Sequence, residues 1–108
     1  MTLQTGDVVL IRMPFHQVPG LKVRPALVLL DTGDDDFIAA PLTSRAWSSE
    51  FDYPLRDWQA AGLNVASTGR IHKLTVLAKA EVVRKLGSCS EEDQVQVRSL
   101  FCQAFCQR

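Results

Sequence analysis

The chain has 108 residues, of which 46% are hydrophobic, and its 12 basic and 12 acidic side chains give a formal net charge of zero. This length suits one compact core, so we expect a single domain over residues 1–108. The neutral balance argues against a protein that coats nucleic acid through its bulk charge. No apolar run approaches the roughly 20 residues that span a bilayer, and residues 1–7 lack the pattern of a signal peptide, so we expect a cytoplasmic protein.

Three strands are predicted in the first half of the chain. Residues 7–13 are rich in Val, Leu and Ile and are followed by a proline. Residues 23–30 are apolar on both faces, as in a strand inside a barrel or sandwich, and an acidic turn leads from them to a partner strand at 37–42. Pro25 cannot donate to a ladder, so we expect it at the start of its strand or on an edge.

The second half gives shorter signals. A brief strand is predicted at 51–55, and helical turns at 56–61 are expected to stop at Gly62. Further strands are suggested at 66–72, including His72, at 74–78, and at 82–86, where Gly87 is expected to end the strand.

The C-terminal segment predicts a helix that begins at Ser90. Ser90 and Asp93 have the spacing of a capping box, and the acidic residues 91–93 suit the positive end of the helix dipole. An apolar stripe follows at helical spacing and is expected to pack on the strands or on a second subunit: Val97, Leu100, Phe101, Ala104 and Phe105. Many short strands with one terminal helix predict a small, strongly curved sheet.

The most informative segment is 20–44. It reads KVRPALVLL at 22–30 and ends its second apolar run in Thr43-Ser44. A charged residue at the mouth of a buried strand is costly unless it has a role. With the sequence GDVVL at 6–10, these motifs resemble the MazF/PemK family of toxin endoribonucleases from type II toxin–antitoxin systems. The resemblance is strongest over residues 6–45 and returns more loosely at 53–55 and 70–87.

The resemblance implies a mainly β fold, an SH3-like barrel with a C-terminal helix, usually assembled as a homodimer. It also implies sequence-selective, metal-independent cleavage of single-stranded RNA, such as mRNA, to 2′,3′-cyclic phosphate and 5′-hydroxyl ends, without a cofactor. A cognate antitoxin is expected, with a flexible acidic segment that covers the RNA groove.

By the same resemblance, the catalytic arginine corresponds to Arg24 and the catalytic threonine or serine to Thr43, with Ser44 beside it. A guanidinium can bind two phosphoryl oxygens of a phosphorane at once, and Pro25 restricts Arg24 to an extended backbone that helps to aim it. The alternative is a strand-edge arginine paired with an acid such as Asp7, and a plain turn at Thr43-Ser44.

The general base is left open, because arginine holds its proton too tightly for that role. Histidine titrates near neutral pH, so His16, in the loop before Lys22, is a candidate base, although a solvated loop histidine is the alternative. His72, on a predicted strand, is interpreted as a structural residue or a phosphate contact.

Aromatic faces and local cations are expected to hold the RNA. Phe15 and Trp47 flank the motifs and could stack bases, although core packing is an equal reading for Trp47, whereas Trp58 is expected to pack on the barrel. The cations that complete the predicted RNA-binding set are Lys22, Arg45, Arg70 and Lys73.

No metal site is predicted. The three consecutive acids at 34–36 point apart in a tight turn and are read as a solvated turn. Cys102 and Cys106 share a helix face, but ordinary buried thiols are favoured over a metal site for the three cysteines of the chain, Cys89 included.

Two other functions stay open, because one fold can host several. The barrel could bind a protein target, as the related CcdB-type gyrase inhibitors do, or it could bind RNA without cleaving it. Cleavage should depend on Arg24 with Thr43, whereas gyrase inhibition does not need that pair.

Overall fold

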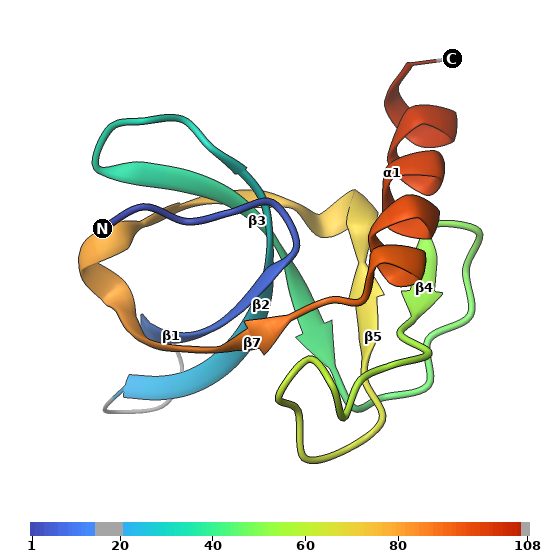
Figure 1. The fold of residues 1–108 in the computed structure, drawn as a ribbon, viewed down its shortest axis with the longest axis horizontal. Coiled ribbons are helices and arrows are strands. Elements are labelled where there is room, and N and C mark those ends of the chain that lie inside the picture. Colours follow the sequence, from blue (N-terminus) through green and yellow to red (C-terminus); the bar gives the residue numbers. More distant parts are fainter. Residues whose placement is uncertain (15–20, 107–108) are drawn as a thin grey trace.

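The computed structural model describes residues 1–14 and 21–106, which form an antiparallel sheet and one C-terminal helix (Figure 1). The predicted mainly β fold with a terminal helix is confirmed. The elements in chain order are β1 (Asp7–Pro14), β2 (Leu21–Asp31), β3 (Asp36–Thr43), β4 (Asp52–Pro54), β5 (Thr68–Arg70), the 3-10 helix η1 (Ile71–Lys73), β6 (Thr75–Ala78), the 3-10 helix η2 (Lys79–Glu81), β7 (Val82–Ser88) and α1 (Glu91–Phe105).

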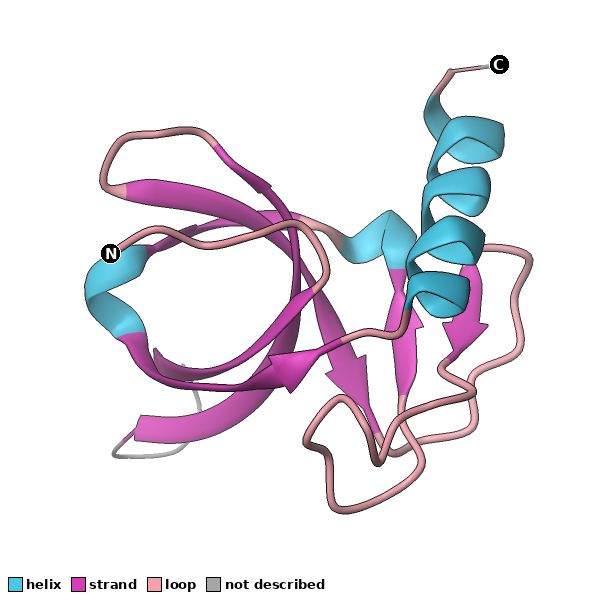
Figure 2. Cartoon of the chain, in the orientation of Figure 1, coloured by secondary structure: helices cyan, strands magenta, loops and turns pink. Residues whose placement is uncertain are grey.

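Two sheets share β3. In the first, which we call the barrel sheet, β7, β1, β2, β3 and β6 lie side by side and curl into a ring, and η2 joins β6 to β7 (Figures 1 and 2). In the second, the small sheet, the end of β3 pairs with β5, and β5 pairs with β4. The strand β3 therefore passes from one sheet into the other within its eight residues.

The barrel strands are buried on both faces. Val8 and Val9, on β1, belong to different apolar clusters, because successive side chains of a strand point to opposite sides. The inner cluster fills the ring and comprises Leu3, Val9, Ile11, Ala26, Val28, Phe37 and Ala39. This two-sided burial explains why the first three strands have continuous apolar runs.

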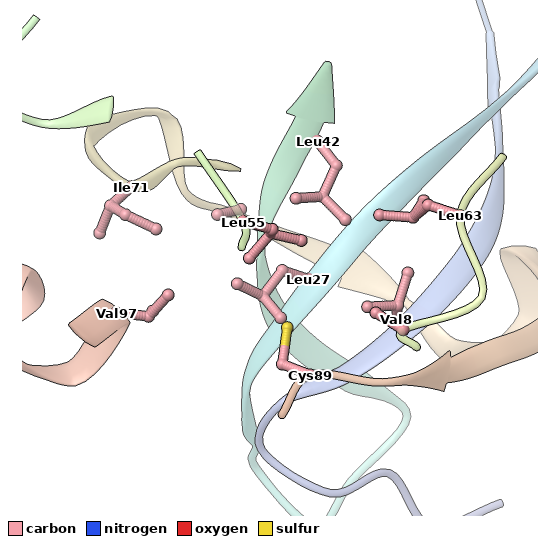
Figure 3. Packing of buried hydrophobic residues seen from close by; sticks show 10 residues of the cluster. Val8, Leu27, Leu42, Leu55, Leu63, Ile71, Cys89 and Val97 are labelled. Atoms are coloured by element: carbon pink, nitrogen blue, oxygen red, sulfur yellow. The ribbon is translucent and has the colours of Figure 1, made fainter. Parts of the chain in front are cut away.

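The outer cluster lies between the barrel sheet, the small sheet and α1 (Figure 3). It holds together parts of the chain that are far apart in sequence, namely Val8, Leu27, Ala40, Leu42, Leu55, Ala61, Leu63, Ile71, Cys89 and Val97. Trp58 packs against this cluster, as expected. The small sheet and α1 thus depend on the outer face of the barrel for their core.

The segment after β4, residues 56–62, forms a turn that ends like the C-terminus of a helix, without a helix before it. Gly62 has a φ of 90°, which lies outside the right-handed helical region. Its N–H donates to Gln59 O, and Leu63 N–H donates to Trp58 O. These two bonds are those of a Schellman motif. The predicted stop at Gly62 is confirmed, although 56–61 forms only this turn.

Gly87 continues β7 instead of ending it, so that prediction is wrong. A Cβ at Gly62 would lie 2.2 Å from Leu86 O, and one at Gly87 would lie 2.5 Å from Ala61 O. The two glycines let the turn touch β7 backbone to backbone. Gly87 was misread because a glycine needed for close approach resembles a terminator in sequence.

Pro25 lies inside β2 rather than at its start. It faces Leu10 of β1, and the ladder between β2 and β3 begins one residue later, at Ala26. Proline is accepted here because only one neighbouring strand pairs at this position.

The helix α1 begins as predicted: Ser90 is its N-cap and its hydroxyl accepts a hydrogen bond from Asp93 N–H. Within the predicted stripe Val97 is buried, but Phe105 is 50% exposed. Cys89 is buried, whereas Cys102 and Cys106 are exposed, so the expectation of buried thiols is wrong for these two. They lie on the last turns of the helix, beyond the sheets it packs on. Within residues 1–14 and 21–106, no helix has the length and apolar character needed to cross a membrane.

Candidate nucleic-acid interface

Arg24 and Thr43 each lie two residues beyond the last pair of the ladder between the neighbouring strands β2 and β3. The ladder between β2 and β3 has Ala26 and Pro41 as its last pair at this end, and the same register, continued for two residues, would set Arg24 opposite Thr43. Both positions continue the strand face that carries Ala26 and Ala39 of the inner cluster, so they lie at the open end of the ring. At this end of β3, Leu42 and Thr43 pair with Gly69 and Thr68 of β5.

The two side chains differ in exposure. Arg24 is exposed, and Thr43 is half-buried. Thr43 Oγ1 accepts a hydrogen bond of 3.1 Å from Arg45 N–H, which turns the chain sharply after β3. That bond uses one acceptor site of the hydroxyl and leaves its proton for another partner. Ser44, next to it, is exposed.

Asp7 has its own partners in the described structure. Lys85 Nζ lies 3.1 Å from Asp7 Oδ1, and Ser88 donates a hydrogen bond to the same oxygen. These contacts tie β1 to β7 at the end of the ring. Asp7 therefore serves as a structural anchor for β7.

Trp47 is assembled with two arginines. Trp47 is 42% exposed, and the guanidinium carbon of Arg70 lies 4.0 Å from the centre of its ring. The guanidinium carbon of Arg45 is farther away, at 5.7 Å. Both distances are within the range of a cation–π contact. Trp47 therefore does not pack in the core, which was one of the two interpretations of this residue.

Arg70 forms an ion pair with the buried side chain of Asp52. Asp52 and Arg70 face each other across β4 and β5, and Arg70 Nε donates to Asp52 Oδ1 at 2.9 Å. The Asp52 side chain is 0% exposed and the Arg70 side chain 18% exposed. Burial disfavours the charge on Asp52, but hydrogen bonds from Ser49 and Arg70 outweigh it, so the pKa of Asp52 is lowered and the ion pair persists.

His72 lies in η1 and not on a strand, contrary to the prediction. Its Nε2 lies 3.5 Å from Arg70 Nη2, and its ring centre lies 5.4 Å from that of Phe51. Because a guanidinium only donates, a hydrogen bond at this contact needs Nε2 as its acceptor. Within the described residues, Nδ1 is buried without a hydrogen-bond partner. His72 therefore supports Arg70 from the protein side.

Of the remaining predicted site residues, two are described by the structure and two are not. Lys22 is on β2 and shares the strand face of Arg24, whereas Lys73 is on η1, and both are exposed. Phe15 and His16 lie outside the described residues. The structure thus brings together Thr43, Arg45, Trp47 and Arg70, with Arg24 and Lys22 on the adjoining strand.

The sequence analysis missed Asp52. Its only signal was an acid in a short strand that pairs with a strand carrying a predicted RNA-binding arginine. Metal-binding clusters of three or more His, Cys, Asp or Glu side chains do not occur in the described part of the chain. The acidic turn is held internally instead, with Asp31 paired to Lys79 at 2.8 Å and Thr32 donating to Asp34.

A sequence model of the PemK-like, MazF-like toxins of type II toxin–antitoxin systems matches residues 4–105. The chain therefore belongs to this family of toxins. No curated protein sequence matches it.

Solved structures show the same fold at low sequence identity. MazF in a MazE–MazF crystal structure from Deinococcus radiodurans superimposes with a TM-score of 0.79 at 20% identity, covering 98% of this chain and 97% of that one. An endoribonuclease of a mycobacterial species, in complex with its cognate antitoxin, gives 0.74 at 13% identity, with 99% and 98% covered. The Mycobacterium tuberculosis toxin MazF-mt6 gives 0.72 at 16% identity, with 93% and 98% covered.

Proposed function

We propose that this toxin is a sequence-selective, metal-independent endoribonuclease that cleaves single-stranded RNA, including mRNA, in the cytoplasm. Support comes from the family assignment, from similar folds named as endoribonucleases, and above all from the β2–β3 register, which would set Arg24 opposite Thr43 if continued two residues past its last pair. The products would be a 2′,3′-cyclic phosphate and a 5′-hydroxyl.

The proposed chemistry follows from the two side chains. In-line attack by the ribose 2′-hydroxyl places extra negative charge on the phosphoryl oxygens. The Arg24 guanidinium would bind those oxygens through its planar fork, and the Thr43 hydroxyl, with Ser44 beside it, would donate to the same group. Lys22, Arg45, Arg70 and Lys73 would contact the strand on either side.

RNA cleavage by purified protein in EDTA tests this proposal, with the product ends mapped. Arg24→Ala should reduce the rate at least a hundredfold, as loss of one oxyanion-stabilising donor does in other enzymes. Arg84→Ala is the matched control, because Arg84 is an exposed arginine on β7 and should keep the parent rate. If the folded protein cleaves no RNA of a randomised pool, the ribonuclease proposal is wrong and a binding toxin becomes the better reading.

Two partners belong to the same proposal. The solved relatives include toxins crystallised with their antitoxins, and the exposed cations around Arg24 suit a flexible acidic antitoxin segment. A second copy of the chain is proposed on the outer barrel face, where Leu30, Ile38 and Val76 form one cross-strand row. Leu30 is 50% and Val76 61% exposed, which is costly in a monomer. Val76→Glu should shift the mass measured by light scattering from dimer to monomer, and a parent protein that is already monomeric would contradict the dimer.

A further inference from the structure

Near Thr43, the ring of Trp47 is held in place by contacts with other side chains of the protein. Trp47 lies in the irregular segment between β3 and β4, where a side chain would ordinarily sample several rotamers. Its ring instead rests on the Arg70 guanidinium at 4.0 Å, and Arg70 projects from the small sheet. The ring is therefore supported by a regular element rather than by its own loop.

The support continues to a fully buried charge. Asp52, whose side chain is 0% exposed, receives Arg70 Nε at 2.9 Å. Ser49 N–H donates to the other carboxylate oxygen of Asp52 at 2.9 Å, and the Ser49 hydroxyl donates to it at 2.7 Å. One carboxylate therefore binds both the arginine under the ring and the end of the loop that carries the ring.

A second contact fixes the plane of the guanidinium. Arg70 Nη2 lies 3.5 Å from His72 Nε2, and Phe51 packs on His72. With its Nε on Asp52 and its Nη2 toward His72, the guanidinium has few orientations left. Its central carbon lies 4.0 Å from the centre of the Trp47 ring.

We propose that Asp52, through Arg70, holds Trp47 as a preformed stacking seat for one unpaired RNA base. Arg70 and Asp52 are positioning residues in this proposal, and Trp47 is the residue that touches the ligand. The proposal rests on the proposed ribonuclease function and deepens it, because it names what is recognised next to the cleaved phosphate. A base inside a duplex has both faces covered, so this seat accepts single-stranded RNA only.

The location agrees with that role. Thr68 pairs with Thr43, and Arg70 is two residues further along β5 on the same strand face. Two residues of a strand span about 7 Å. A base on Trp47 therefore belongs to a nucleotide close to the phosphate that Arg24 and Thr43 would hold.

Binding of 2′-O-methyl RNA 12-mers, measured by quenching of Trp fluorescence, tests the seat without any cleavage. These probes lack the attacking hydroxyl, and homopolymers of A, C and U together with a hairpin duplex cover the base types and the paired state. We expect single strands to quench the fluorescence and the duplex not to. Trp58 contributes a constant background, because it packs against the outer cluster.

The variants separate stacking from charge. Trp47→Ala should abolish the quench and weaken binding about tenfold, and Trp47→Phe should restore much of the affinity. Arg70→Lys keeps the charge but cannot present a flat face to the ring while it bonds to Asp52, so it should weaken binding severalfold. Arg84→Lys is the matched control, because Arg84 is an exposed arginine on β7 away from Trp47, and it should bind as the parent does. Asp52→Asn should act like Arg70→Lys, with circular dichroism confirming that each variant is folded.

The outcomes distinguish this proposal from the ribonuclease function. Unchanged binding in Trp47→Ala, or equal quenching by the duplex, would overturn the seat even if the enzyme cleaves RNA. Quenching that depends on Trp47 and Arg70 in a protein that cleaves nothing would support the seat and overturn the ribonuclease. If Arg70→Lys binds as tightly as Arg84→Lys and the parent protein, only the charge at position 70 matters, and this result would also overturn the proposal.

Discussion

The barrel sheet and the small sheet are built on different physical principles. The barrel strands β1, β2 and β3 are eight to eleven residues long and bury apolar side chains on both faces. The strands β4 and β5 have three residues each and are anchored by two buried carboxylates, Asp52 and Asp93. The candidate site lies where β3 crosses from one sheet to the other. A stable scaffold thus supports a small, polar-anchored region that carries the proposed RNA contacts.

Phe37→Ala should have the largest effect on stability, because it breaks the barrel itself. Phe37 is 0% exposed in the inner cluster, and such a truncation costs about 3–5 kcal/mol. Urea unfolding followed by circular dichroism measures the loss. Phe105→Ala is the control, since that phenylalanine is half exposed. Equal losses for the two would contradict the assignment of the inner cluster as the core.

Gly62→Ala should rank next, because it breaks the contact between the two regions. A Cβ there would lie 2.2 Å from Leu86 O on β7 at a φ of 90°, so left-handed strain and a backbone clash should together cost about 3 kcal/mol. Gly33→Ala is a matched control: its φ is 84° and no atom lies within 4 Å of a Cβ. It should cost only about 1 kcal/mol. Thermal unfolding of both variants gives the comparison.

Asp93→Asn should loosen α1 from the small sheet. Asp93 is 0% exposed and accepts hydrogen bonds from Tyr53 Oη at 2.5 Å, from Asp57 N–H at 2.9 Å and from Arg56 N–H at 3.1 Å. An amide cannot accept at both positions, so we expect a loss of about 2 kcal/mol in urea unfolding at pH 7. Tyr53→Phe, which removes only one of these bonds, should cost less than Asp93→Asn.

Protonation of Asp93 should lower the free energy of unfolding of the parent protein at acid pH. Burial raises the pKa of Asp93, but hydrogen bonds from Tyr53, Asp57 and Arg56 outweigh it, so the folded-state pKa is lowered. A lowered carboxyl pKa stabilises the fold above the unfolded value of about 4, and this contribution disappears as the pH falls through the folded pKa. Unfolding free energies measured between pH 6 and pH 2 should therefore fall more steeply for the parent protein than for Asp93→Asn. Parallel curves would contradict this role.

Thiol labelling should give the smallest and most local signal. Burial raises the pKa of Cys89 to about 12, so this thiol in the outer cluster should resist an aromatic disulfide reagent in the native protein. Cys102 and Cys106 are exposed and should react at once. Asp93→Asn should speed labelling of Cys89 at a denaturant concentration that leaves the barrel folded. A Cys89 that reacts as fast as Cys102 in the parent protein would contradict the described burial.

Long elements were predictable because their signals are repeated. Two-sided apolar runs gave β1, β2 and β3, and the Ser90 cap with the following acids gave the start of α1. Three-residue strands offer no such repetition, and residues 70–72 were read as one strand although Arg70 ends β5 and His72 lies in η1. Cys102 and Cys106 were misjudged because a helical stripe does not tell where the helix leaves its sheet.

Local sequence patterns were enough to predict the family and the curved sheet with a terminal helix, and they suggested the pair of Arg24 and Thr43, which stays a proposal. These depend on local patterns and on motifs that stand within single strands. The folded arrangement was needed to find that Asp52 holds Arg70 beside Trp47, that Asp93 joins α1 to the small sheet, and that Gly62 and Gly87 bring a turn onto β7. Each of these depends on contacts between residues distant in sequence, so no pattern within one segment could reveal them.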